Sequence, residues 1–188
     1  MNKILKKVTY LIFVIVLISC GTNKDINDTK VNTYPNSKYK KSRTAYSGTL
    51  NKTEYDELIK KLETELKTTF PANKSILINY NQKAPNCINV RFSEKDNKQV
   101  TNNRIRISSR MSSNYNAIDF FVYAKDSYNV KIYEQMNEFI IDSGFFYENV
   151  FTEHQNCAGF LIIKPNGDFY KWYGEDYYSE VKAFLEKK

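Results

Sequence analysis

The chain of 188 residues has a single histidine and three cysteines, so few side chains are available for metal, nucleophilic or redox chemistry. It has no phosphate-binding loop, no cysteine spacing typical of zinc sites and no dinucleotide-binding glycine motif. No internal repeat is visible. Lys and Arg outnumber Asp and Glu by 28 to 21, but they are spread along the chain instead of clustered. We therefore expect no cofactor, no metal and no nucleic-acid partner.

The apolar run near the N-terminus is too short to span a membrane, which takes about 20 residues. It occupies 8–18 and is interrupted only by Thr9 and Tyr10. Three lysines precede it, and Ser19 follows it. A positive region, a short apolar region and a small residue are typical of a secretory signal peptide. We predict that residues 1–19 form a cleaved leader and take no part in the fold.

Cys20 closes the segment Leu17-Ile18-Ser19-Cys20 at the end of this leader. The segment resembles the lipobox of bacterial lipoproteins. The resemblance implies that the Cys20 thiol is acylated, that the leader is cut before it, and that several acyl chains anchor the protein to a membrane of the cell envelope. Gly21 is not the acidic residue that holds such proteins at the inner membrane, so we expect the outer membrane, with a periplasmic or surface-facing domain. The alternative is an ordinary signal peptide with an incidental cysteine.

The part after the leader divides into a polar stretch and one domain. Residues 20–48 are rich in Asn, Lys, Thr and Ser, a composition that cannot bury enough apolar surface to offset its ordering entropy. We predict a flexible tether there, with an edge strand near 46–50. Residues 49–188 have the length and the aromatic content of a single domain. Without the leader the charge falls to +4, with 25 basic and 21 acidic side chains.

The sequence of the first half of the domain predicts one helix and two buried strands. Thr53-Glu54-Tyr55-Asp56 matches a capping box with Thr53 as the N-cap, and apolar residues at helical spacing follow it up to Phe70-Pro71. Runs at 75–80 and 118–123 are apolar enough for strands that are buried on both faces. Between them, 90–92 and 105–107 alternate like edge strands, and 94–103 is compatible with a loop or a helix.

The second half predicts a helix, a hairpin and a final helix. Apolar spacing over 130–141 favours a helix that stops near Gly144, and 145–151 returns toward the sheet. A strand at 159–163 is followed by the turn Lys164-Pro165-Asn166-Gly167-Asp168 and a return strand at 169–173. Gly174-Glu175-Asp176 then caps the last helix.

This order of elements resembles the thioredoxin-like fold, an α/β three-layer sandwich with a mixed sheet; another α+β domain is the alternative. The run 160–168 is similar to that family's closing hairpin. The run 76–80, followed by Cys87, is similar to the strand that leads into the family's redox site. The family's Cys-x-x-Cys motif is missing, because the chain reads Cys87-Ile88-Asn89-Val90. Its cis-proline is also replaced, by Asn156-Cys157-Ala158. The resemblance therefore concerns the topology and puts ordinary dithiol exchange in doubt.

The thioredoxin-like topology implies that Cys87 and Cys157 lie close together at one pole of the sheet. In an oxidising compartment such a pair forms a disulfide, and a loop of about 70 residues would gain about 4 kcal/mol. A redox-active or metal-binding pair and two unconnected thiols remain open. His154 stands three residues before Cys157 and could support a thiolate or join a metal site with Glu153, or be an ordinary loop histidine.

The aromatic residues near the C-terminus have two interpretations: a platform for a sugar or a peptide, or ordinary packing. They are Tyr170, Trp172, Tyr173, Tyr177 and Tyr178. Side chains alternate along a strand, so at least one face of this group belongs to the core.

Two functions follow from these patterns. The first is an envelope lipoprotein whose domain has a binding or structural role toward an unidentified partner, without dithiol redox activity. The second is an atypical thiol-disulfide oxidoreductase that uses Cys87 and Cys157, tuned by His154. We favour the first, non-enzymatic function, because the second cysteine of the redox motif is missing.

Overall fold

The computed structural model describes residues 31–187. The helices are α2 (Ser37–Ser42), α3 (Lys52–Leu66), α4 (Glu94–Asn114), α5 (Val130–Tyr133) and α6 (Tyr178–Glu186). The strands are β1 (Thr44–Thr49), β2 (Ser75–Asn81), β3 (Ala117–Tyr123), β4 (Phe139–Ile141), β5 (Ala158–Ile163) and β6 (Asp168–Tyr173). A 3-10 turn (Ile88–Arg91) and a π turn (Phe146–Val150) complete the described elements.

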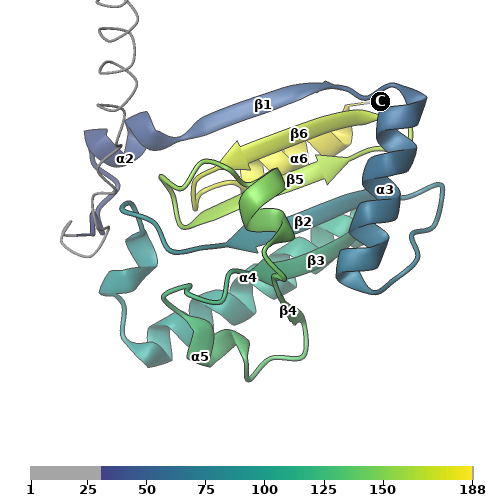
Figure 1. The fold of residues 1–188 in the computed structure, drawn as a ribbon. Helices are drawn as coiled ribbons and strands as arrows, with labels where there is room; N and C mark the ends of the chain where they lie inside the picture. Colours follow the sequence, from purple (N-terminus) through teal and green to yellow (C-terminus); the bar gives the residue numbers. More distant parts are fainter. Residues whose placement is uncertain (1–30, 188) are drawn as a thin grey trace, which may run out of the picture.

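The six strands form one mixed sheet in the order β1-β6-β5-β2-β3-β4 (Figure 1). Strands β2, β3 and β4 run parallel, whereas β5, β6 and β1 pair antiparallel with their neighbours. The predicted α/β class with a mixed sheet is thus confirmed. A parallel strand-helix-strand unit, β2-α4-β3, is followed by α5 and β4, and then by the β5-β6 hairpin and α6.

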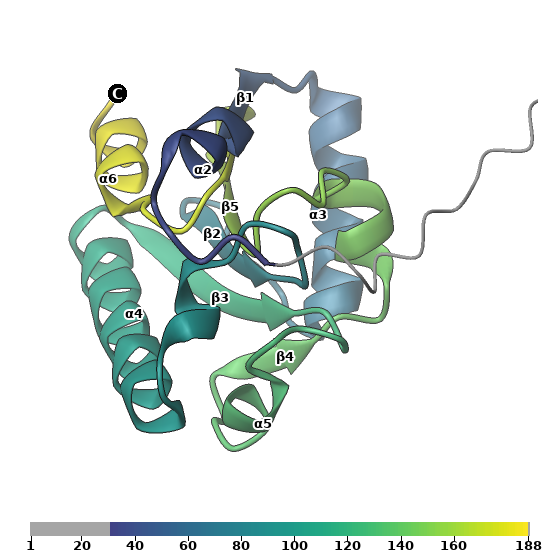
Figure 2. The same ribbon diagram turned by 90° about the vertical axis from the view of Figure 1, so that its left-hand side faces the viewer.

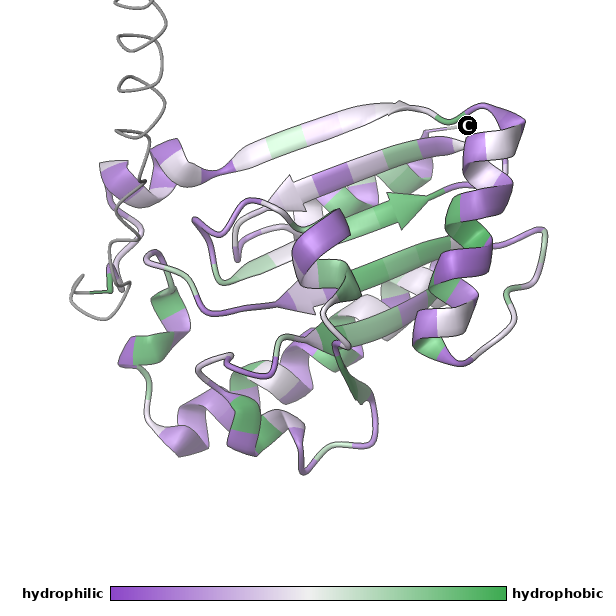
Figure 3. Cartoon of the chain, viewed as in Figure 1, coloured by the Kyte–Doolittle hydropathy of each residue, from purple (hydrophilic) through white to green (hydrophobic). Residues whose placement is uncertain are grey.

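Helices cover both faces of the sheet, which gives three layers (Figure 2). Helix α3 and the π turn lie on one face, and α4 and α6 on the other. Strand β2 is buried along its whole length, with Ile76, Ile78 and Tyr80 in the core under α3 and Leu77 in the core under α6. Successive strand side chains point to opposite faces, so a strand covered on both sides is apolar on both. Figure 3 shows the same division, with hydrophobic central strands and mostly hydrophilic outer helices.

Helix α3 is capped by a different residue from the one predicted. The N-cap is Asn51, whose side chain accepts from the backbone N–H of Glu54 while the Glu54 carboxylate accepts from the backbone N–H of Asn51. Thr53 lies inside the first turn. A capping box is therefore present two residues earlier, because asparagine caps as well as threonine does.

The predicted edge strands at 90–92 and 105–107 are wrong. The first region is the 3-10 turn, and the second lies within α4. Ser93 caps α4 by accepting from the backbone N–H of Asp96. The buried positions of the helix recur at helical spacing but are mostly polar: Asn97, Thr101, Ser108, Met111 and Ser112. A search for apolar periodicity misses such a face.

The predicted helix over 130–141 ends early, at Tyr133. Phe139–Ile141 forms β4 instead and extends the sheet beyond β3. The Phe139 ring stacks on Tyr133 at a centroid distance of 4.4 Å, so the apolar residues that suggested one helix face meet across a turn. The stretch 145–151 returns to the sheet as predicted, with Phe146 and Phe151 in the core.

The folded domain includes residues that we predicted to lie in the flexible tether at 20–48. Within 31–48 the chain forms α2 and most of β1, which pairs with β6 as the expected edge strand. The Tyr39 side chain is buried, and its hydroxyl accepts from the backbone N–H of Glu175 at 2.7 Å. This contact ties a polar segment to the domain, which composition alone does not reveal. The leader, Cys20 and residues 21–30 lie outside the described residues.

The C-terminal hairpin and helix agree with the prediction. Gly167 in the turn has φ of +90°, and a Cβ there would come within 2.6 Å of the Leu50 carbonyl oxygen. The turn thus needs glycine for its conformation and for the close approach of 49–51. Helix α6 begins after Tyr177, with no side-chain capping bond from Glu175 or Asp176, so the predicted cap is wrong. Among residues 31–187 no helix is both long and apolar enough to cross a membrane.

Candidate functional site

Cys87 and Cys157 come together at the pole of the sheet where β2 ends and β5 begins. Their sulfurs lie at disulfide-bonding distance, and their Cα atoms are 5.2 Å apart. Backbone bonds hold the two segments side by side, since the Cys157 N–H donates to the Asn86 carbonyl at 3.1 Å. The proximity that the topology implied is confirmed. Residues 70 positions apart are brought together by the antiparallel pairing of β2 with β5.

The disulfide pair is enclosed by residues from several segments. The two cysteines are only 1% and 3% exposed, respectively. Val31, Val90 and Tyr128 pack against them. The N-terminal segment is fixed there by backbone bonds, because the Cys87 N–H donates to the Asn32 carbonyl at 2.9 Å. Little of either cysteine is therefore accessible to a reactant in solution.

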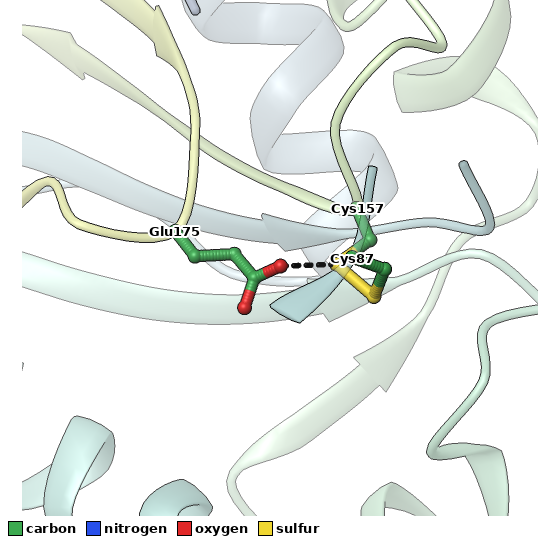
Figure 4. Close-up of side chains that lie close together, drawn as sticks. All are labelled: Cys87, Cys157 and Glu175. Carbon is green, nitrogen blue, oxygen red and sulfur yellow. Dashed lines mark hydrogen bonds between the residues drawn. A yellow bond between two sulfur atoms is a disulfide. The ribbon is translucent and has the colours of Figure 1, made fainter. Parts of the chain in front are cut away.

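Glu175 is a member of this site that sequence reasoning missed (Figure 4). Its Oε1 lies 3.0 Å from the Cys157 Sγ, and its carboxylate accepts from the backbone N–H of Ile88. Asn89 contributes a second oxygen, with Oδ1 2.8 Å from the Cys87 Sγ. No spacing pattern links a residue between β6 and α6 to the cysteines. The only available signal was an acidic residue next to a predicted sheet pole.

Burial raises the pKa of Glu175 to about 7. The backbone N–H of Ile88 and the charge of Arg104 act in the opposite direction, because both favour the carboxylate. The carboxyl group consequently exchanges its proton near neutral pH, directly beside a sulfur atom.

A buried polar network lies behind the site. Arg104 of α4 donates to Asn81 Oδ1 at 2.8 Å and to the Tyr177 hydroxyl at 2.9 Å. Tyr177 in turn donates to Asn79 Oδ1 at 2.8 Å. The pKa of Arg104 is raised, chiefly by the neighbouring Tyr177 and Tyr178 against the effect of burial, so the guanidinium stays charged. The network joins α4, β2 and the start of α6 on the side of the sheet that α4 and α6 cover.

His154 does not join the cysteines. Its ring stacks on Tyr147 at a centroid distance of 3.8 Å, and Nδ1 lies 2.8 Å from Gln82 Oε1. Burial lowers its pKa, so the neutral ring is favoured. Glu153 accepts from the hydroxyls of Thr44 and Tyr46 on β1. Among the described residues, the carboxylate that joins the cysteine pair is that of Glu175.

The C-terminal aromatic residues are packing residues. Tyr173 and Tyr177 are buried, while Tyr170 and Trp172 pack from the other side of β6 against the core under α6. Tyr170 stacks on Phe184 of α6 at 5.3 Å. Tyr178 packs against the same core.

Two hollows adjoin the site. A crevice of about 10 Å³ is lined by polar and aromatic residues and by the cysteines: Asn81, Gln82, Cys87, Asn89, Ser127, Tyr128, Asn129, Tyr133 and Cys157. Tyr128 and Asn129 also line a groove of about 660 Å³ between the 3-10 turn, the start of α4 and α5. The groove therefore borders the disulfide pole.

Comparisons with known proteins leave the family open. No protein-family model matches the chain, and a search of curated proteins found no relative.

Proposed function

We propose that the protein is a lipid-anchored domain of the cell envelope with a binding or structural role, closed by a Cys87–Cys157 disulfide. The observation that carries this proposal is the cysteine pair at bonding distance. Disulfides form and persist in oxidising compartments outside the cytoplasm. The leader and the segment Leu17-Ile18-Ser19-Cys20 support the same location. Once Cys20 carries lipid, the two remaining cysteines are the two that meet.

The burial of the pair supports a structural bond over an exchanging one. Exchange requires a thiolate to reach a disulfide sulfur, and access limits its rate. Here both cysteines are buried, and Val31, Val90 and Tyr128 pack against the cluster that contains them. The groove beside them, at about 660 Å³, has the size of a ligand or peptide site. We therefore place partner binding at this pole.

Lipid attachment is tested by labelling cells that make the full chain with an alkyne-tagged fatty acid. The parent protein is expected to carry the label and to fractionate with membranes. Cys20→Ser is expected to lose both properties, whereas Cys157→Ser keeps the label. A parent protein that is unlabelled and released in soluble form would contradict the anchor.

Thiol-disulfide exchange is the second candidate, and the position of Glu175 favours it. Attack of a substrate thiolate on Cys87 would break the Cys87–Cys157 bond, form a mixed disulfide and release Cys157. Cys157 leaves as a thiolate and would take its proton from the Glu175 carboxyl group, whose oxygen lies 3.0 Å away.

A disulfide reductase assay separates the two candidates. The structural function predicts no turnover by the parent protein above the level of Cys87→Ser and Cys157→Ser. Turnover by the parent that is lost in both variants would establish the exchange function instead.

A further inference from the structure

We propose that the reduced protein binds one zinc-type metal ion through Cys87, Cys157 and Glu175. The site goes beyond the proposed function, because it depends neither on the lipid anchor nor on exchange with a substrate. One ligand atom from each residue lies within 4.8 Å of the other two. Cys87 lies in the loop after β2, Cys157 directly before β5, and Glu175 in the loop after β6 (Figure 4).

The distances suit a tetrahedral ion. Zinc binds thiolate sulfur at about 2.3 Å and carboxylate oxygen at about 2.0–2.2 Å, which places two sulfur ligands about 3.8 Å apart. The cysteine Cα atoms are 5.2 Å apart, so rotation of the side chains is enough to separate the sulfurs once the disulfide is reduced. Glu175 Oε1, 3.0 Å from the Cys157 Sγ, needs only a small shift to the third position.

The fourth position faces Asn89 and the crevice. Asn89 Oδ1 lies 2.8 Å from the Cys87 Sγ and 3.8 Å from the Cys157 Sγ. The crevice of about 10 Å³ has room for about one water molecule. Three protein ligands with a water in the fourth position are typical of zinc sites that keep an open coordination position. Asn89 Oδ1 is placed to accept a hydrogen bond from that water.

Apart from the backbone N–H of Ile88, which donates to Glu175 Oε1, the oxygens around the sulfurs have little to bind. A disulfide has neither a proton to donate nor a positive charge, so Glu175 and Asn89 gain little from facing one. Arg104, whose charge acts on Glu175, makes its hydrogen bonds to Asn81 and Tyr177. Among residues 31–187, no ion pair involves Glu175. A bound cation would satisfy both oxygens together.

Reduction and metal binding form a balanced sequence. A dithiol reductant gives two electrons and two protons to the Cys87–Cys157 bond and becomes a disulfide itself. The metal ion then displaces the two thiol protons to solvent, which leaves two thiolates and a carboxylate around it. Soft sulfur ligands favour zinc over magnesium or calcium. Transfer of the two electrons back to the disulfide form of that reductant reverses the sequence and releases the ion.

The test is a titration with Co²⁺, which reports thiolate ligands by its absorption. The full chain without its leader is reduced in denaturant, refolded without oxygen and titrated. The expected result is one Co²⁺ per chain, with a thiolate charge-transfer band and the strong visible bands of tetrahedral cobalt, and displacement by Zn²⁺. The oxidised protein is expected to bind none.

Variants establish whether Glu175 is a ligand. Glu175→Gln is expected to weaken Co²⁺ binding at least tenfold and to change the visible bands, whereas Glu153→Gln, outside the cluster, leaves both unchanged. Circular dichroism checks the fold of each variant, and Glu175→Asp, which keeps the carboxylate, is expected to restore part of the binding. Equal binding by the parent and Glu175→Gln, or no binding by the reduced parent, would overturn the proposal.

Discussion

Glu175 and the two cysteines show how single side chains from distant parts of the chain define the site. Cys87 and Cys157 are held by backbone pairing between the ends of β2 and β5, while Glu175 enters from the loop after β6. Its backbone N–H donates to the Tyr39 hydroxyl, so the N-terminal segment helps to position it. Any change at the site therefore affects four parts of the fold together.

His154 provides a residue-scale prediction about pH. Its folded pKa is lowered by burial below the ordinary value of 6.5, so the unfolded chain binds more protons as the pH falls past that value. The stability that His154 contributes is complete above pH 6.5 and is lost as the pH drops toward its folded pKa. His154→Phe, which keeps a ring against Tyr147 and does not titrate, should lose less stability than the parent between pH 7.5 and about 5.

Urea unfolding of both proteins across this range measures the difference. Because the two proteins share Glu175 and all other titrating groups, the effects of those groups cancel in the comparison. Parallel pH profiles for parent and variant would mean that His154 titrates alike in the folded and unfolded chains.

At the residue scale, the sequence predicts the cysteine pair and misses its carboxylate. The pair follows from topology, because adjacent strand ends must meet. Glu175 belongs to a loop, where its direction depends on the buried Tyr39 and on the start of the 3-10 turn. His154 is separated from Cys157 because Gln82 and Tyr147 hold its ring. Close spacing along the chain does not bring these two side chains together.

At the scale of elements, the cap of α3 distinguishes the structure from the sequence pattern. Asn51 accepts from the Glu54 N–H at 3.0 Å, and Thr53 has no capping role. Asn51→Ala should lower the unfolding free energy by about 1 kcal/mol. Thr53→Ala is the matched control and should change it by less than about 0.5 kcal/mol. Chemical denaturation measures both, and the reverse order of effects would restore Thr53 as the cap.

Helix α4 is attached to the sheet by Arg104 as well as by apolar residues such as Met111. Arg104→Met would leave Asn81 Oδ1 and the Tyr177 hydroxyl without their charged donor. We expect a loss of about 2 kcal/mol of stability, since hydrogen bonds to charged groups contribute about 1.5–3 kcal/mol. Arg110→Met on the exposed side of the same helix should be nearly neutral. Equal losses for the two variants would show that the network adds little.

The polar inward face of α4 also explains why this helix was not predicted over its full length. Its inward face carries Asn97, Thr101 and Ser108, which bond to backbone and to Asn79. Polar side chains that satisfy one another can be buried without apolar periodicity. The helices and strands with apolar faces, such as α3, β2 and β5, were predicted close to their observed bounds. Strand β4 was not, because three residues paired to a sheet edge leave no pattern of their own.

At the scale of the whole molecule, the disulfide joins the two halves of the sheet. It closes a loop of 70 residues that contains α4, β3 and β4. The double variant Cys87→Ala/Cys157→Ala should lose about 4 kcal/mol of unfolding free energy, because the unfolded chain regains the entropy of the open loop. Urea unfolding with and without reductant measures it. Reductant should destabilise the parent and leave the double variant unchanged; a variant as stable as the parent would contradict a structural role.

The overall architecture was predictable because it depends on the order of buried strands. Two apolar strands separated by a helix-length segment, followed by a hairpin and a helix, have few ways to pack into one sheet. The position of the N-terminal segment was not predictable, since Tyr39 is the one buried side chain of α2. A buried tyrosine with two hydrogen bonds, together with backbone bonds at Asn32, fixes a segment whose composition resembles a linker.

The central claim is that Cys87 and Cys157 form a disulfide in the protein as the cell makes it. The direct measurement is peptide mass spectrometry of protein purified without reductant, after free thiols have been blocked. The account predicts a single cross-linked species that joins the peptides containing Cys87 and Cys157. Recovery of both peptides with blocked, unbonded thiols would contradict it.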